Sequence, residues 1–253
     1  MLKVRVIPCL LLQDGGLVKT ENFKNPRYLG DPINAVKIFN KKEVDELIFI
    51  DIQASKNKTE PNWEIIKDLA SECFMPLAYG GGINSLDQIR KLLKIGVEKV
   101  IINQEAIKNP SFITHAVEHF GSSTIVCAVD IKKNIWGKYE VYDHVKGILT
   151  GQSPLDYISK LDKLGVGEVF INNVNREGTF EGIDLDIVKS VINKISIPLI
   201  ICGGVSSLAD ILLAAKSGVS GISVGSMFVF QGPHRAVLIS YPSYEDFRKI
   251  LNN

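Results

Sequence analysis

The sequence lacks the features that would direct a protein to nucleic acid or to a membrane. Its 29 basic and 28 acidic residues leave a formal net charge of +1, so no electrostatic attraction to a polyanion is expected. No apolar run approaches the length of about 18 residues that a membrane span needs. The opening MLKVRVIPCLLL has neither the apolar length nor the small-residue cleavage site of a secretory signal. We therefore expect a cytoplasmic protein with no membrane or nucleic-acid partner.

Cysteine and histidine are also scarce, with four residues of each. The cysteines have no paired spacing, which predicts reduced thiols rather than disulfides. His115 and His119 share a helix face but have no third ligand nearby, so a solvated surface is favoured over a metal site. His144 and His234 have no nucleophile or carboxylate partner that the sequence reveals, and we interpret them as loop residues. No GxGxxG, P-loop or nucleophile-elbow motif is present, and we expect no metal and no cofactor.

The sequence does contain a regular alternation of short β-branched runs and amphipathic segments over its 253 residues. Helix-like segments with apolar residues three and four apart include 32–44, 86–95 and 208–217. Eight such strand–helix units predict parallel pairing through right-handed crossovers. A single (β/α)₈ barrel commonly takes about 250 residues, so we predict one TIM-barrel domain over 1–253. Its predicted strands are 4–11, 47–52, 76–79, 100–103, 125–130, 169–173, 198–202 and 222–225.

An internal repeat supports this barrel. The segment MPLAYGGGINSLDQIRKLLKIGVEKVIIN (75–103) aligns without gaps with IPLIICGGVSSLADILLAAKSGVSGISVG (197–225). The two segments are offset by about half the chain, which predicts two repeated half-barrels. Closing eight strands removes the edges of the sheet, whereas an open doubly wound sheet explains the duplication less simply.

The repeat also duplicates a pattern typical of phosphate binding. In such barrels the active face lies at the carboxyl ends of the strands. A glycine pair lets backbone N–H groups approach an anion with no Cβ in the way, and the following polar turn presents further amides. Tight strand–helix turns need glycine as well, but the duplication favours two phosphate sites and a phosphorylated small-molecule ligand. The candidate residues are Gly81, Gly82, Asn103 and Gln104 in one half, and Gly203, Gly204, Gly225 and Ser226 in the other.

In several predicted strands, the first of the alternate residues that face the barrel axis is charged. Alternate residues of a barrel strand face the axis, and this places Arg5, Glu46, Lys99 and Glu168 at the bottom of the barrel. Isolated buried charges cost several kcal/mol each, so two cations and two carboxylates would form a mutually neutralising ring. The alternative is that strand starts are solvent-exposed and therefore often charged.

Several segments in order resemble the cyclase subunit of imidazole glycerol phosphate synthase, over essentially the whole chain. They include IPCLLLQDGGLVK (7–19), NFKNPRYLGDP (22–32), DELIFIDI (45–52), EKVIIN (98–103) and GVGEVFI (165–171). The resemblance implies a glutaminase partner docked under the barrel and ammonia passing up its axis. It assigns Arg5, Glu46, Lys99 and Glu168 to the gate of this channel. It also implies that ammonia attacks an open-chain bisphosphorylated ribulosyl nucleotide, which gives imidazole glycerol phosphate and an aminoimidazole ribonucleotide.

The resemblance implies catalytic roles for Asp130 and Lys19, the latter matching a mobile-loop lysine. The family's second aspartate would stand at Leu11, and a leucine cannot transfer a proton. Loss of a positioned acid or base typically costs about 10²–10⁴ in rate, and Asp14 lies beyond the strand end in a poor position to replace it. A further phosphate contact at Gly178 is retained, although Glu177 stands where the family usually has aspartate.

The chain is most similar to a branch of this family encoded with surface-polysaccharide genes. In that branch the partners include a glutaminase and a sugar amidotransferase that converts an N-acetyl group into an acetamidino group. The tail FQGPHRAVLISYPSYEDF (230–247) shares this similarity, and it packs on the barrel or contacts a partner. Three functions follow: ammonia relay to a sugar amidotransferase, active cyclisation in histidine biosynthesis, and a non-catalytic scaffold that activates the glutaminase.

Overall fold

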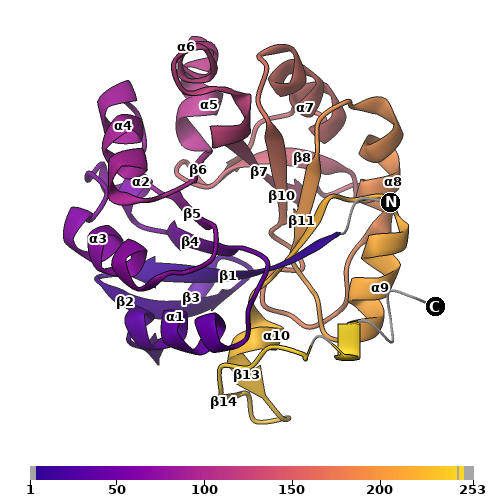
Figure 1. Ribbon diagram of the computed structural model, residues 1–253. Coiled ribbons are helices and arrows are strands. Elements are labelled where there is room, and N and C mark those ends of the chain that lie inside the picture. The colour runs from indigo at the N-terminus through magenta and orange to yellow at the C-terminus, as the bar shows by residue number, and fades with distance from the viewer. Residues whose placement is uncertain (1–3, 244, 248–253) are drawn as a thin grey trace.

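The structure is a computed structural model that describes residues 4–243 and 245–247. Eight parallel strands close into a barrel with helices around it (Figure 1). β1 pairs with β12 on one side and with β4 on the other, and the β7–β10 pairing completes the circle. The predicted (β/α)₈ barrel is therefore confirmed. The barrel strands are β1 (Arg5–Gln13), β4 (Leu47–Asp51), β5 (Leu77–Gly80), β6 (Lys99–Ile102), β7 (Ile125–Lys133), β10 (Glu168–Asn173), β11 (Leu199–Cys202) and β12 (Gly221–Val224).

The helices surround the barrel and bury one apolar face each. The longer ones are α1 (Pro32–Lys41), α3 (Trp63–Glu72), α4 (Leu86–Ile95), α6 (Pro110–Phe120), α7 (Pro154–Lys163), α8 (Leu185–Val191) and α9 (Leu208–Lys216). Three short helices follow strand ends: α2 (Ala54–Asn57), α5 (Gln104–Lys108) and α10 (Ser226–Val229). Among the described residues, no helix combines the length and apolarity that crossing a bilayer requires.

Two apolar layers hold this arrangement together. A large cluster lies between the strands and the helices. A smaller one fills the inside of the barrel and contains Ile7, Ile48, Ile101 and Phe170. Because alternate residues of a strand face opposite sides, the β-branched runs of the sequence supply both layers. The barrel interior is therefore a packed core below a cavity, as is usual for this architecture.

The sequence repeat corresponds to a repeat in structure. Ser85 and Ser207 each cap the N-terminus of their helix, α4 and α9, through the side-chain oxygen. Gly81 and Gly203 both adopt positive φ, at 123° and 110°. A Cβ at Gly81 would lie 2.6 Å from the Asp51 carbonyl oxygen, and one at Gly203 would lie 2.8 Å from that of Asn173. Glycine is thus required here by backbone geometry and by close approach to the neighbouring strand.

The antiparallel hairpins outside the parallel barrel were not predicted from the sequence. β2 (Gly16–Glu21) and β3 (Lys24–Gly30) extend from the carboxyl end of β1, and β8 (Tyr139–Asp143) and β9 (Ile148–Leu149) follow β7. The turn from β1 into β2 is signalled by Asp14-Gly15, since both residues adopt positive φ, at 48° and 82°, between the paired Gln13 and Gly16. An Asp-Gly pair between alternating residues is a strong hairpin signal, and it was missed because the resemblance assigned the nearby Lys19 to a mobile loop.

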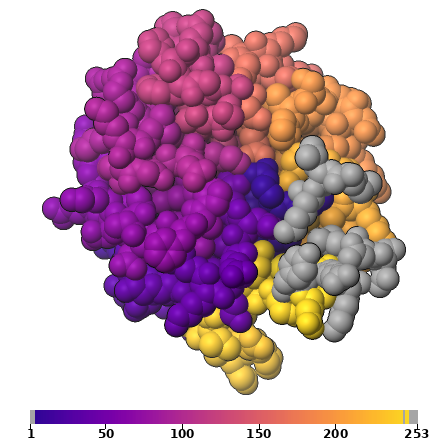
Figure 2. All heavy atoms as spheres, in the orientation of Figure 1, coloured from indigo at the N-terminus to yellow at the C-terminus, as the bar shows by residue number. Residues whose placement is uncertain are grey.

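The last hairpin begins the tail. β13 (Phe230–Gln231) and β14 (Ala236–Val237) project from the body of the molecule (Figures 1 and 2). Further along, Tyr241 is buried against Phe39 and Phe228, and its hydroxyl donates a hydrogen bond of 3.0 Å to the Val6 carbonyl. The tail therefore packs on the barrel through Tyr241, while Leu238 stays 54% exposed.

Candidate functional site

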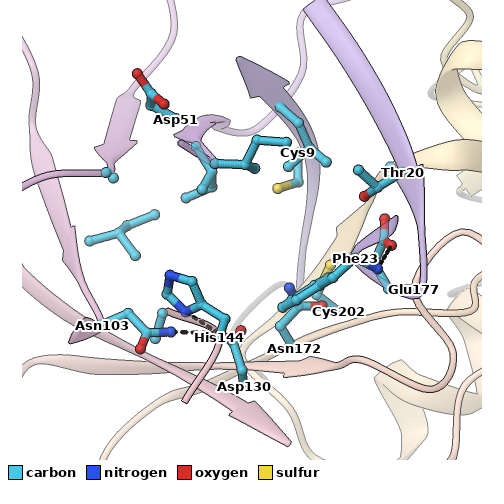
Figure 3. Close-up of a pocket in the computed structure, with 18 of the residues that line it drawn as sticks. Cys9, Thr20, Phe23, Asp51, Asn103, Asp130, His144, Asn172, Glu177 and Cys202 are labelled. Atoms are coloured by element: carbon cyan, nitrogen blue, oxygen red, sulfur yellow. Dashed lines mark hydrogen bonds and ion pairs between the residues drawn. The ribbon is translucent and has the colours of Figure 1, made fainter. Parts of the chain in front are cut away.

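A cavity of about 390 Å³ opens at the carboxyl ends of the barrel strands. All predicted catalytic and phosphate-binding positions line it, although they come from both halves of the chain. Figure 3 shows the side chains that point into this space from several strands. The lining includes Leu11, Lys19, Gly81, Gly82, Asn103, Gln104, Asp130, Gly178, Gly203, Gly204, Gly225 and Ser226.

Asp130 forms the centre of a polar cluster at one wall of the cavity. Its Oδ2 accepts a hydrogen bond of 2.8 Å from Asn103 Nδ2 and contacts His144 Nδ1 at 3.0 Å (Figure 3). A carboxylate is an acceptor only, so the Nδ1 atom of His144 carries the proton in this contact. The Asp130 carboxylate is therefore held in place from two sides, and the His144 imidazole extends the cluster into the cavity.

His144 lies in the turn after β8, as a loop residue was expected to, but the expectation that it has no carboxylate partner was wrong. The residue follows β8, and the β7–β8 hairpin folds it back beside Asp130 of β7. Burial alone would lower the pKa of His144, but the hydrogen bond and the charge of Asp130 outweigh burial and raise it. Fourteen residues separate the two in sequence, so only the Ile131–Val141 strand pairing, unrecognised in the sequence, could have revealed the contact.

Leu11 also lines the cavity, and it packs against the apolar side chains inside the barrel. It supplies no group that can donate or accept a proton. Asp14 lies in the β1–β2 turn and lines a different, neighbouring cavity. Asp14 is thus not a substitute for a carboxylate at position 11.

Lys19 lies on β2 and is buried, in contrast to the mobile loop that the resemblance implied. Its ammonium forms an ion pair with the Glu177 carboxylate, while Glu177 Oε2 accepts a hydrogen bond of 3.0 Å from the Phe23 backbone N–H. Burial lowers the pKa of Lys19 to about 8. Glu177 therefore ties the β2–β3 hairpin to the loop after β10, over one side of the cavity.

The two predicted phosphate edges face each other across the cavity, and several of their polar atoms lack a partner. Asn103 Oδ1, Gln104 Oε1 and Ser226 Oγ are buried and make no hydrogen bond. Gln104 Nε2 lies 3.4 Å from Asp143 Oδ2. Unpartnered buried polar atoms are costly unless a ligand or water satisfies them, so this lining suits a polar ligand.

At the opposite end of the barrel, four charged side chains meet. Arg5 contacts Glu46 and Glu168, and Lys99 Nζ lies 3.0 Å from a carboxylate oxygen of each. The four residues stand at or next to the starts of β1, β4, β6 and β10, so their contacts cross the inside of the barrel. Positively and negatively charged side chains alternate around this ring of four, and the ring is neutral overall. Glu46 is only 2% exposed, which excludes the alternative of a solvated strand start for this residue.

Comparison with known proteins agrees with this geometry. The family model described as "Histidine biosynthesis protein" matches residues 5–234. The chain belongs to this family. Among the described residues, no cluster of three or more histidine, cysteine or carboxylate side chains is placed to hold a metal ion.

Relatives within the histidine biosynthesis protein family cover almost the whole chain. One from Pseudomonas aeruginosa, provisionally named imidazole glycerol phosphate synthase subunit hisF2, is 48% identical over 96% of this chain and 97% of its own. A relative from Leptospira interrogans, provisionally named subunit HisF, is 46% identical over 97% of this chain and 98% of its own length. A third relative, from Vibrio vulnificus and provisionally named subunit hisF3, is 41% identical over 99% of this chain and 97% of its own length. The resemblance to the synthase subunit is thus confirmed at the level of the family.

The His144–Asp130 contact of this family member predicts a pH-dependent stability. The folded state keeps the imidazole protonated to higher pH than the unfolded chain does. The stabilisation is therefore complete below the ordinary value of 6.5 and is lost as pH rises through the raised pKa. We expect His144→Gln to lower the free energy of unfolding more at about pH 5.5 than at about pH 8.5. Urea denaturation at both values measures this, with His119→Gln as an exposed control, and an equal loss at both pH values contradicts it.

Proposed function

We propose that the chain is the ammonia-receiving subunit of a glutamine-dependent synthase. A glutaminase docks at the floor of the barrel, and ammonia passes through the Arg5–Glu46–Lys99–Glu168 ring into the cavity above. The ring carries this proposal. Its charges are compensated in pairs, so a small neutral molecule meets no net charge at the entrance, and stray ions must break these contacts to pass.

The acceptor of the ammonia is, in this proposal, a sugar amidotransferase that forms an acetamidino group in cytoplasmic precursors of a surface polysaccharide. Leu11 supports an acceptor outside the family's usual cyclisation, because the barrel lacks one of the two carboxylates expected for it. Relatives with names numbered 2 and 3 support a role separate from the ordinary subunit. The four free cysteines fit the cytoplasm. Polar edges at the mouth would hold a phosphorylated ligand.

A second candidate is an active cyclase in histidine biosynthesis, with Lys19 and Asp130 in catalysis. The observation in its favour is His144, a titratable group beside Asp130 inside the cavity. Complementation of a cyclase-deficient histidine auxotroph separates the two candidates. Growth supports the cyclase, whereas no growth with protein demonstrably expressed supports the relay.

An isotope experiment tests the relay directly. The chain, its glutaminase and the sugar amidotransferase are supplied with glutamine labelled in the amide nitrogen, in a medium that contains unlabelled ammonium. We expect the acetamidino product to keep most of the label, because channelled ammonia does not mix with the medium. Product with the isotope ratio of the medium would contradict channelling. No product, despite glutamine hydrolysis and an active amidotransferase, would contradict this acceptor.

A further inference from the structure

Two hairpins from opposite ends of the chain meet beside the cavity. One is the β2–β3 hairpin, and the other is the tail hairpin that β13 and β14 form over 230–237 (Figure 1). Arg235, in the turn of the tail hairpin, forms an ion pair of 2.5 Å with Glu21, the last residue of β2. The backbone carbonyl of Arg235 accepts a hydrogen bond of 3.0 Å from the Arg27 guanidinium on β3. The tail hairpin is therefore fastened to both strands of the β2–β3 hairpin.

The two guanidinium groups also lie over aromatic rings. The Arg27 guanidinium carbon is 5.2 Å from the centre of the Phe230 ring on β13. That of Arg235 is 5.1 Å from the centre of the Phe180 ring, in the loop after β10. The negative face of an aromatic ring attracts a cation at such distances. Arg235 thus joins β2, the loop after β10 and its own hairpin.

The loop after β10 holds β2 through backbone contacts as well. The Asn22 N–H donates a hydrogen bond of 2.8 Å to the Glu177 carbonyl. A Cβ at Gly178 would lie 2.3 Å from the Thr20 carbonyl oxygen, so glycine lets the loop approach the strand closely. The ion pair between Lys19 and Glu177 adds to these contacts. The β2–β3 hairpin is thus held by two separate segments, the loop after β10 and the tail hairpin.

Each hairpin needs the other to keep its position. β3 is exposed from Lys24 to Tyr28, and β13 and β14 pair over only two residues each. A two-stranded hairpin alone is marginally stable in water. Phe23 and Arg235 have positive φ, at 63° and 49°, a conformation that residues of this size keep only when their surroundings hold them in it. The contacts between the hairpins supply this support.

We propose that the tail hairpin is a latch, which holds the β2–β3 hairpin closed over one side of the cavity and whose release widens access to the cavity. Lys19 and Phe23 of the β2–β3 hairpin line the cavity, and Figure 3 shows Phe23 among the lining side chains. Arg235 lies outside this lining, so it acts through these two residues and is a positioning residue. The inference goes beyond the proposed function, because the latch limits entry whichever molecule accepts the ammonia.

Hydrogen exchange of backbone amides in the purified chain measures the opening of the latch. We expect Arg235→Gln to speed exchange over 16–30 about tenfold, because it removes the ion pair with Glu21 and the contact with Phe180 together. Exchange in β7 should stay the same, since the barrel strands do not depend on the latch. Unchanged exchange over 16–30, or an equal increase in β7, overturns the proposal.

Charge reversal tests whether the ion pair itself closes the latch. Glu21→Arg and Arg235→Glu each place like charges together, so both should speed exchange over 16–30. The double variant restores a pair of opposite charges and should exchange more slowly than either single variant. Arg90→Gln breaks an exposed ion pair with Asp87 on α4 and is the matched control, with no expected change over 16–30. A double variant that exchanges as fast as the single variants overturns the role of this pair.

A thiol reagent measures access to the cavity. Cys9 is buried and lines the cavity, whereas Cys127 is buried in the layer between the strands and the helices. Iodoacetamide is the probe, and mass spectrometry locates the alkylated residue. In Arg235→Gln we expect Cys9 to react about tenfold faster and Cys127 to react at its former rate. An unchanged rate at Cys9, or an equal gain at both residues, overturns control of entry by the latch.

Discussion

With free ammonium as the nitrogen source, the purified chain will convert the bisphosphorylated ribulosyl nucleotide about 10²–10⁴ times more slowly than a cyclase with both aspartates. The reason is the side chain at position 11. Asp130 lies in the cavity with its carboxylate held by Asn103 and His144, but Leu11 offers no second proton-transfer group on the β1 side. Free ammonium bypasses the glutaminase, so the rate reports on the chemistry of the cavity alone.

Leu11→Asp is the informative variant for this prediction. It places a carboxylate at the cavity wall, and we expect it to raise turnover of the ribulosyl nucleotide by at least about tenfold. Leu11→Asn is the matched control, since asparagine is similar to aspartate in size and polarity but cannot exchange a proton at neutral pH. Turnover of the unchanged chain at ordinary cyclase rates would contradict the prediction. Equal gains from Leu11→Asp and Leu11→Asn would show that polarity, rather than proton transfer, limits the reaction.

The barrel could be predicted from the sequence because local and long-range signals agree. Short β-branched runs alternate with amphipathic segments, and the repeat of 75–103 in 197–225 places equivalent glycines and serine caps in both halves. The charge ring could also be predicted, since residue parity within a strand decides which side chains face the axis. Arg5, Lys99 and Glu168 are the first residues of their strands, and Glu46 directly precedes β4.

The arrangement of the mouth could not be predicted in the same way. His144 reaches Asp130 only because the β7–β8 hairpin folds back, and Glu177 reaches Lys19 from a loop 158 residues away. Such contacts depend on loop and hairpin conformations, which have no simple periodicity. The Asp-Gly turn at 14–15 was the one local signal available. It would have placed Lys19 on a strand, but not beside Glu177.

The ring at the floor leads to the second large expected effect. Lys99→Met removes one of two cations while keeping a side chain of similar length, so Glu46 and Glu168 are left with Arg5 alone. The ring then carries a net charge of −1 inside the barrel entrance. A unit charge about 4 Å away attracts ammonium by up to about 4 kcal/mol at an effective dielectric constant of 20. We expect the amount of amidated product per glutamine hydrolysed to fall by about tenfold or more, because nitrogen is retained as ammonium and lost to the medium.

Restoring neutrality tests whether charge balance is the cause. The double variant Lys99→Met with Glu46→Gln leaves only the Arg5–Glu168 pair, which is neutral, and coupling should largely return. Lys94→Met removes an exposed lysine from α4, just before the same strand, and should leave coupling unchanged. Product and glutamate are measured together in the complex with the glutaminase and the acceptor enzyme. Unchanged stoichiometry in Lys99→Met would place the ring off the path of ammonia. A double variant no better than Lys99→Met would mean that the shape of the ring, rather than its neutrality, controls passage.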